Sequence, residues 1–429
     1  MENPGYYVRC SFQTGETQLL SAPSSSALLA WFAKHLTWGL SPGDGLMDLR
    51  QMGLLFMAIL AAIFATGIAR GFPIPIALLM VYVIVDPGYL LFFNSFYADG
   101  ALFVALIGAS IWLERLETKT HAICEHGLSA WILAVVAFAF LAFLGSGSKM
   151  QYVFFSAVML LAMGIPLIAR IRVCPHRIIA LIATVALVFL ASWWNFFFGP
   201  GPRFLVFNNY HAVYGGILRV VSEPEKVLED LDVPRQYWNL PKTDAWSGNI
   251  GIDHPVHQHL KSISRLTLLK HYVFDSSARS AILKEMANKL ALIESHPRGT
   301  RVREESGRKP VKRTLELPWQ YSRLSRWFFA AWPPIIWFAI GGCAAWILIG
   351  SRINGWTGMM TTAFFLLLWI VTQAVIAVLG EGLINLHQHL IGARLGLDLL
   401  FVFVAADMGS SIWLIFKARR TMALQTDTP

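Results

Sequence analysis

The residues that could do chemistry lie in four short polar segments between long apolar stretches. The first segment carries two carboxylates, Asp86 and Asp99, on either side of an aromatic run that includes Tyr97. A positioned carboxylate can accept the proton of a hydroxyl nucleophile, and an ionisable group inside an apolar stretch, such as Asp86, is usually functional. We predict Asp99 as a catalytic base and Asp86 and Tyr97 as substrate-binding residues. The alternative is structural, with Asp86 paired internally and Asp99 capping the next helix.

The second segment, from Gly145 to Tyr152, combines small residues with Lys149. Small residues let a bulky ligand approach the backbone, and a lysine ammonium binds phosphate as a point charge. We predict that Lys149 binds the phosphate of a donor substrate. The alternative is a flexible turn whose lysine extends towards the membrane surface.

The third segment begins at Gly380 and holds Glu381, His387, His389 and Arg394. Groups of these types bind anions and sugars. We predict His389 and Arg394 as further phosphate ligands and Glu381 and His387 as substrate-binding residues. The two histidines are two positions apart and do not share a helix face, so we predict no metal site here. Anchoring at the membrane interface is the alternative.

The fourth segment, from Arg203 to Tyr214, places amides next to Tyr210 and His211. Aromatic and amide groups side by side suit stacking on a sugar and recognition of its hydroxyls. They also suit the aromatic belt of a membrane interface. We predict Tyr210 and His211 as substrate-binding residues.

The elements that position these segments are membrane helices. Of the 429 residues, 55% are hydrophobic and 14% are charged, against about 25% charged in a soluble domain. The apolar residues come in blocks of roughly the 17–25 that cross a bilayer as helix. We predict an all-α polytopic membrane protein with nine spans at 51–69, 72–93, 98–114, 128–144, 150–169, 177–198, 327–349, 357–379 and 395–416.

The orientation of the spans follows from lysine and arginine in the short loops, which favour the cytoplasmic side. These residues are Arg70, Arg115, Lys119, Arg170, Arg172, Arg177 and Arg352, with Lys417, Arg419 and Arg420 after the last span. All four polar segments then lie on the external side. We predict a multi-pass protein of the bacterial inner (plasma) membrane, with the long loop external and the C-terminus cytoplasmic.

Five parts of the chain follow from this topology. They are an external segment at 1–50, a six-span bundle at 51–198, an external module at 199–326, a three-span bundle at 327–416 and a basic cytoplasmic tail at 417–429. Residues 27–38 have the pattern of an amphipathic helix lying at the membrane interface. Helical periodicity over 276–295 predicts that the module is mostly helical. The start of the chain has no recognisable signal peptide.

The net charge of +9 comes mostly from membrane anchoring and the long loop, and we find no signature of nucleic-acid binding. The four cysteines are scattered, with neither a disulfide framework nor metal-ligand spacing. No phosphate-cradling P-loop is present. The sequence does not identify a cofactor.

The chain resembles the WsfD-type glycan biosynthesis hexosyltransferases over roughly residues 45–416. The motifs that carry the resemblance are Asp86-x-Gly-Tyr89, Phe93-Asn-Ser-Phe-Tyr97, Tyr210-His-Ala-Val-Tyr214, Pro224, Leu228-Glu-Asp-Leu231, Gly380-Glu-Gly382 and His389. The resemblance implies an inverting C-type (GT-C) glycosyltransferase that takes a hexose from a polyprenyl-phosphate donor on the outer membrane face. The family pattern begins with one more span and an acidic external loop, of which this chain shows no recognisable copy.

We therefore predict a membrane hexosyltransferase that modifies a cell-surface glycan or glycoconjugate. Its partners would be the polyprenyl-phosphate hexose donor, the glycan acceptor and the lipid bilayer. Two alternatives from other classes stay open. A catalytically inactive or truncated chain could serve as an assembly or scaffold protein. A transporter would have paired halves with broken helices around midplane charges, and the sequence shows one Pro-Gly break and no repeat.

Overall fold

The structure is a computed structural model, and it describes most of the chain. The described residues are 7–9, 24–36, 46–93, 99–125, 128–168, 175–198, 203–245, 248–251, 253–291, 321–354, 356–384 and 386–426. Nearly all of their regular structure is helical. The exception is a short antiparallel pair of strands, β1 (Tyr7–Arg9) and β2 (Leu46–Asp48), in which Val8 faces Met47.

Five helices among the described residues are long and apolar enough to cross a bilayer. They are α3 (Leu49–Ala69), α9 (Pro175–Phe198), α16 (Ile335–Asn354), α17 (Gly358–Glu381) and α19 (Ile391–Thr426). Three shorter apolar helices accompany them: α4 (Ile74–Ile84), α7 (Leu128–Ser146) and α8 (Phe155–Ile168). The helical membrane class is thus confirmed, and the count of nine spans stays a prediction.

Two of the predicted spans are divided by proline in the structure. The stretch 72–93 is two helices, α4 and α5 (Pro87–Phe93), because Pro87 has no backbone N–H to continue the helical ladder. The stretch 327–349 is also divided. A short amphipathic helix, α15 (Tyr321–Phe329), precedes α16, and Pro333 and Pro334 separate them. In both places proline ends an apolar run that hydropathy alone reads as continuous.

The centre of the bundle is α6 (Asp99–Glu125), which packs against α3, α7, α8, α17 and α19. Its residues from Ala101 to Ile111 are almost completely buried. Close helix contact needs small residues here: a Cβ on Gly108 would lie 2.4 Å from a methyl group of Leu141 on α7. The central position of α6 fixes where its first residue, Asp99, lies relative to the surrounding helices.

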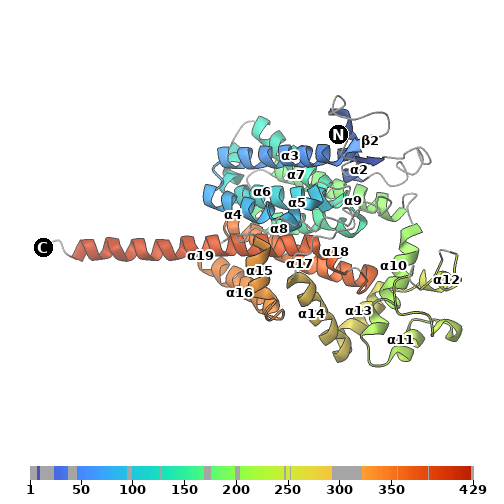
Figure 1. Cartoon of the computed structure of the whole chain (residues 1–429). Helices are drawn as coiled ribbons and strands as arrows, with labels where there is room; N and C mark the ends of the chain where they lie inside the picture. The colour runs from blue at the N-terminus through green and yellow to red at the C-terminus, as the bar shows by residue number, and fades with distance from the viewer. Residues whose placement is uncertain are drawn as a thin grey trace, which may run out of the picture.

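The helices connect two opposite ends of the bundle (Figure 1). At one end, Leu383 N–H donates to Gly215 O over 3.3 Å, so the start of the long loop touches the end of α17. At the other end, Gly71 approaches Arg115, and Gly358 approaches the backbone of Glu114. The far part of α19 projects from the bundle away from the loop region (Figure 1). Which end faces which side of a membrane stays a prediction.

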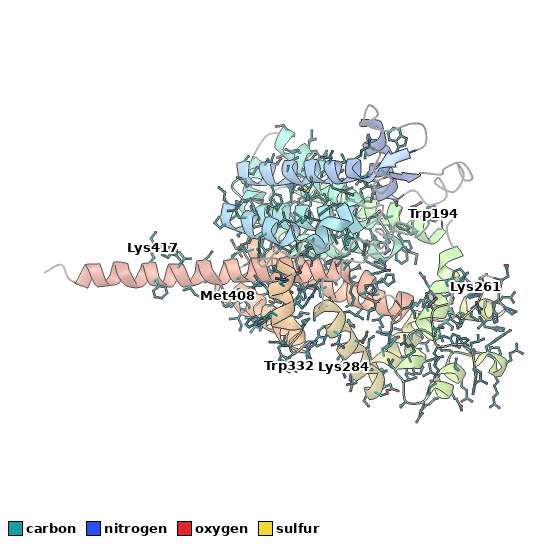
Figure 2. All side chains as sticks on the ribbon, viewed as in Figure 1. Trp194, Lys261, Lys284, Trp332, Met408 and Lys417 are labelled. Carbon is teal, nitrogen blue, oxygen red and sulfur yellow. The ribbon has the colours of Figure 1, made fainter. Side chains whose placement is uncertain are left out.

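The described part of the long loop forms a helical module. Its elements are α10 (Arg203–Val213), η4 (Ile217–Arg219), α11 (Pro224–Asp230), η5 (Arg235–Tyr237), α12 (Val256–Leu260), α13 (Arg265–Phe274) and α14 (Ser276–Ala291). Lys261 and Lys284 lie in this module, and Lys417 lies on the projecting part of α19 (Figure 2). The predicted helix at 276–295 is confirmed over 276–291.

The amphipathic helix predicted at 27–38 is present as α2 (Ser25–Leu36). Its Leu29 and Ala33 are buried, whereas Leu28, Trp31 and Phe32 are exposed. The helix is tied to the bundle where Ser25 N–H donates to Gly147 O over 2.7 Å. Its position at a membrane surface stays a prediction.

Candidate functional site

The candidate site is built around η3 (Met150–Tyr152), a single 3-10 turn between α7 and α8. The hydroxyl of Tyr152 donates a hydrogen bond to the carboxylate of Asp99. Both side chains are buried, and the Tyr152 ring packs against Trp369 of α17 with ring centroids 6.0 Å apart. The Lys149 ammonium lies 5.7 Å from the centre of the Tyr152 ring. Tyr152 therefore brings together the predicted base and the predicted phosphate ligand.

The neighbouring residue Gln151 extends this group to the third polar segment. Its side-chain oxygen lies 2.7 Å from Nδ1 of His389, which ends α18 (Leu386–His389). Its backbone oxygen accepts a hydrogen bond of 3.0 Å from the amide of Gln373 on α17. We call Asp99, Lys149, Gln151, Tyr152, Gln373 and His389 the Tyr152 cluster. It joins three residues predicted from separate polar segments.

The electrostatics of the Tyr152 cluster combine a carboxylate with a cation. Asp99 is the first residue of α6, where the helix dipole favours negative charge. Lys149 is partly exposed, and no carboxylate of the described residues forms an ion pair with it. The buried Asp99 carboxylate, held by the Tyr152 hydroxyl, is of the type that can accept a proton. The Lys149 ammonium, over the Tyr152 ring, is of the type that can bind an anion.

The small residues before Lys149 have a packing role. A Cβ on Gly145 would lie 2.2 Å from the ring of Phe155, and one on Gly147 would lie 2.6 Å from the oxygen of Phe143. Ser146 is hydrogen-bonded to Ser156 of α8 at 2.5 Å. These residues pack the turn against its own helices, which corrects our expectation that they leave room for a ligand at the backbone.

Arg394 lies in a second polar group, deeper in the bundle. Its guanidinium forms a two-point ion pair with Asp398, with nitrogen–oxygen distances of 2.9 and 3.2 Å. It also donates to the backbone oxygen of Leu290 and to the hydroxyl of Ser325. All three guanidinium nitrogens thus have partners inside the protein, and the side chain is only 1% exposed. The predicted role as a phosphate ligand would require phosphate to replace these bonds.

Two tyrosines complete this second group. Tyr89 of α5 donates to Asp398 over 2.5 Å, and Tyr321 of α15 donates to the same carboxylate over 2.7 Å. We call Arg394, Asp398, Tyr89, Tyr321 and Ser325 the Arg394 network. It joins α5, α15 and α19, and through the oxygen of Leu290 it also holds the end of α14.

Asp86 lies beside this network and also has structural partners. Its carboxylate accepts N–H bonds from Gly88 at 2.8 Å and from Ser322 at 2.7 Å. The first bond caps the start of α5 after the break at Pro87, and the second attaches α15. This is the internal pairing that we gave as the alternative for Asp86, and its substrate-binding role stays a prediction.

The aromatic residues at the start of the module are buried rather than open to solvent. Tyr210 and Tyr214 stack with ring centroids 4.8 Å apart, and neither side chain is exposed. Their hydroxyls donate to the backbone oxygens of Pro241 at 2.6 Å and Tyr237 at 2.8 Å. Burial raises the pKa of Tyr210 to about 12, so its hydroxyl stays protonated. These tyrosines hold the segment 235–242 in place.

His211 supports the same part of the module, since its Nε2 accepts the N–H of Ala245 over 3.0 Å. Among the other predicted residues, His387 lies in α18, two positions before His389 of the Tyr152 cluster. Tyr97 and the side chain of Glu381 lie outside the described residues. Their predicted substrate contacts stay predictions.

Sequence reasoning missed Tyr152, Gln373 and Tyr321 as members of polar groups. Tyr152 is the last residue of the second polar segment, where the prediction concerned only Lys149. A tyrosine in an apolar stretch usually needs a partner for its hydroxyl, and this signal was available. Gln373, inside the predicted span 357–379, was a similar signal, because amides in apolar spans also need partners.

Comparison with known proteins gives one family match. The model described as the YfdI N-terminal transmembrane domain matches residues 6–423. No curated protein and no solved structure matches the chain. The match and the five long apolar helices agree on a transmembrane protein. The WsfD-type resemblance stays a prediction.

Proposed function

The chain belongs to the YfdI N-terminal transmembrane domain family, and we propose that it is an integral membrane glycosyltransferase. In this proposal it transfers a hexose from a polyprenyl-phosphate donor to a glycan or glycoconjugate of the cell surface. Family membership supports the membrane setting, and the WsfD-type resemblance suggests the class of donor. The observation that carries the proposal is the hydrogen bond from Tyr152 to Asp99 with Lys149 beside it.

The reaction that we propose is a single displacement at the anomeric carbon of the donor sugar. The oxygen of an acceptor hydroxyl forms a bond to that carbon while the bond from the carbon to the phosphate oxygen breaks. Asp99 takes the hydroxyl proton. The bonding electrons leave with the polyprenyl phosphate, and Lys149 stabilises its charge. Tyr152 acts through Asp99, because it orients the carboxylate.

Two features of the Tyr152 cluster support this assignment over a purely structural one. Lys149 is partly exposed and has no ion-pair partner among the described residues, so its charge is available to a ligand. His389 meets the cluster from α18, on the same side as the module. The Arg394 network, by contrast, contains its own counter-charge.

A transfer assay tests the proposed enzyme. The full chain would be reconstituted in liposomes with a polyprenyl-phosphate hexose that is radiolabelled in the sugar. Asp99→Asn should lower transfer by roughly 10²–10⁴-fold, with yield and donor binding kept, because the amide has the same shape but accepts no proton. Asp253→Asn, which changes an exposed carboxylate in the module, should keep the wild-type rate.

Two results would contradict the proposal at different levels. Transfer near the wild-type rate in Asp99→Asn would leave Asp99 as a helix-terminal residue and move the base elsewhere. Absence of transfer by the wild-type chain from each polyprenyl-phosphate hexose would reject the enzyme and favour the scaffold alternative.

We further propose that the module faces the outside of a bacterial plasma membrane and that Lys417 lies in the cytoplasm. The basic residues of the short loops support this orientation, and the module and the far part of α19 lie at opposite ends of the molecule (Figure 2). In a chain without its native cysteines, Lys284→Cys should react with an impermeant thiol reagent in intact cells. Lys417→Cys should react only after lysis, and the reverse pattern would invert the topology.

A further inference from the structure

A polar groove opens on the module between α11 and the segment 235–242. Its volume is about 860 Å³, and the side chains that line it include Lys226, Glu229, Arg235, Trp238 and Asn239. Sites for small ligands span roughly 300–1,000 Å³, so the groove has the size of a binding site for a molecule of several rings. In Figure 1, α11 lies at the edge of the module that is remote from the α3–α9 bundle.

The charges of this groove are balanced. Three acidic residues, Glu223, Glu225 and Glu229, line it together with three basic ones, Lys226, Arg235 and Lys242. Two acidic residues lie within ion-pair distance of a basic one: Glu223 is 3.5 Å from Lys226, and Glu229 is 3.8 Å from Arg235. The balance favours neither an anionic nor a cationic ligand. It does provide many donors and acceptors of hydrogen bonds.

Trp238 supplies a fixed aromatic surface in this polar setting. Its indole N–H donates to the backbone oxygen of Val233 over 2.8 Å, which holds the ring in one orientation. The guanidinium of Arg235 lies over one face of the ring, 5.5 Å from its centre, which leaves the other face for a ligand to stack on. The ring is partly exposed. An immobilised indole surrounded by hydrogen-bonding groups matches a sugar, whose ring has apolar C–H faces and a rim of hydroxyls.

The wall of the groove is held from behind by the buried tyrosine pair. Tyr210 binds the backbone of Pro241, and Tyr214 binds that of Tyr237, on either side of Trp238. The segment 235–242 has little regular structure apart from the single turn η5, and these two hydrogen bonds help to fix its path. Tyr210, which we predicted as a sugar-stacking residue, would then act on the sugar through Trp238.

We propose that this groove binds a neutral oligosaccharide, stacked on Trp238, as the acceptor glycan of the transfer reaction. Its identification as the acceptor rests on the proposed function, whereas sugar binding does not. The groove would hold a part of the glycan away from the Tyr152 cluster. It would raise the affinity for acceptors of several sugars without taking part in the chemistry.

Saturation-transfer NMR on the full chain in nanodiscs tests this inference. The probes are neutral tetrasaccharides of glucose, galactose, mannose and rhamnose, with tetragalacturonate as the charged comparison. At least one neutral probe should bind the wild-type chain. Trp238→Ala should weaken that binding by at least about tenfold, Trp238→Phe should keep most of it, and Lys284→Ala, away from the groove, should not change it. Asn239→Ala, at an exposed position, should weaken it without affecting folding.

Three outcomes would overturn the inference. These are absence of binding by every neutral probe, binding that survives both Trp238→Ala and Asn239→Ala, and stronger binding of tetragalacturonate than of the neutral probes. The Asp99→Asn chain separates this inference from the proposed function, because it should bind the probe as well as wild type. Transfer without groove binding would reject the groove alone, and groove binding without transfer would reject the enzyme alone.

Discussion

The Tyr152 cluster and the Arg394 network both use polar residues near the start of α19, but they differ in how completely their charged groups are paired. In the Arg394 network the cation and the carboxylate face each other, and Arg394 and Asp398 are 1% and 0% exposed. In the Tyr152 cluster the carboxylate is bound by a neutral hydroxyl, and among the described residues Lys149 lies over the Tyr152 ring and forms no ion pair. The charges of the Arg394 network are paired with each other, whereas the charge of Lys149 is available to a ligand.

This difference shows why an arginine in an apolar span is weak evidence for a substrate site. A buried ion pair gains little net stability, because its attraction is offset by the cost of removing both charges from water. Removing one partner of the pair is nevertheless strongly destabilising, because the other charge then stays buried without a counter-charge. The Arg394 network therefore holds α5, α14, α15 and α19 in one arrangement, while the Tyr152 cluster is the better candidate for chemistry.

The largest effect on folding should come from Asp398→Asn, which leaves the Arg394 charge buried without its counter-charge. We expect a loss of about 3–5 kcal/mol in stability, visible as a fall in folded yield and in thermal stability of the purified chain. Asp407→Asn on the same helix is the matched control, because its amide oxygen can still accept the bond from Trp346. A stable Asp398→Asn chain that fails only in transfer would make the Arg394 network the active site.

The next effect should come from Lys149→Ala. Loss of a charge-assisted bond to phosphate costs about 1.5–3 kcal/mol, so donor affinity should fall by about tenfold to a hundredfold while acceptor affinity stays the same. Direct binding of the polyprenyl-phosphate hexose measures this. Lys149→Arg should keep most of the affinity. Unchanged donor binding in Lys149→Ala would remove Lys149 from the site.

A smaller effect should follow from Tyr152→Phe, which keeps the ring and removes the hydroxyl that binds Asp99. We expect kcat to fall by about tenfold and KM to stay nearly constant. Tyr89→Phe is the matched change in the Arg394 network, since it removes the bond to Asp398. That variant should lower stability and leave kcat unchanged. If the two variants exchanged these effects, our division between site and scaffold would be wrong.

The smallest effect should be a dependence of module stability on pH through His257. Burial lowers the pKa of this imidazole, so on acidification the unfolded chain takes up the proton before the folded chain does. The stabilising contribution is therefore complete above the ordinary pKa of about 6.5 and is lost as pH falls below it. Thermal unfolding between pH 7.5 and about 5 should show a weaker decline in His257→Gln. The exposed His259→Gln should follow wild type, and equal slopes in all three chains would contradict the assignment.

The sequence predicted the helical membrane class and the described long apolar helices in outline, because apolar length acts locally. The long apolar helices and α14 followed from patterns within about twenty residues, whereas prolines divide the predicted spans 72–93 and 327–349 into two helices each. The sequence also identified Asp99, Lys149 and His389 as chemically informative. Alternation of the loops predicted one common end for them, and their contacts through Tyr152 and Gln151 agree with that expectation.

Tertiary structure alone decided what each polar residue pairs with. Asp99 and Tyr152 are 53 positions apart, and Asp86 and Ser322 are 236 positions apart, so no local pattern links them. Tyr210 looked like a sugar-binding residue, but packing turned its ring inward and its hydroxyl to the backbone of Pro241. Composition and periodicity determine which segments enter the membrane, since burial of apolar surface depends on the segment itself. Whether a polar group is satisfied or available depends on distant partners, and only the folded chain brings those together.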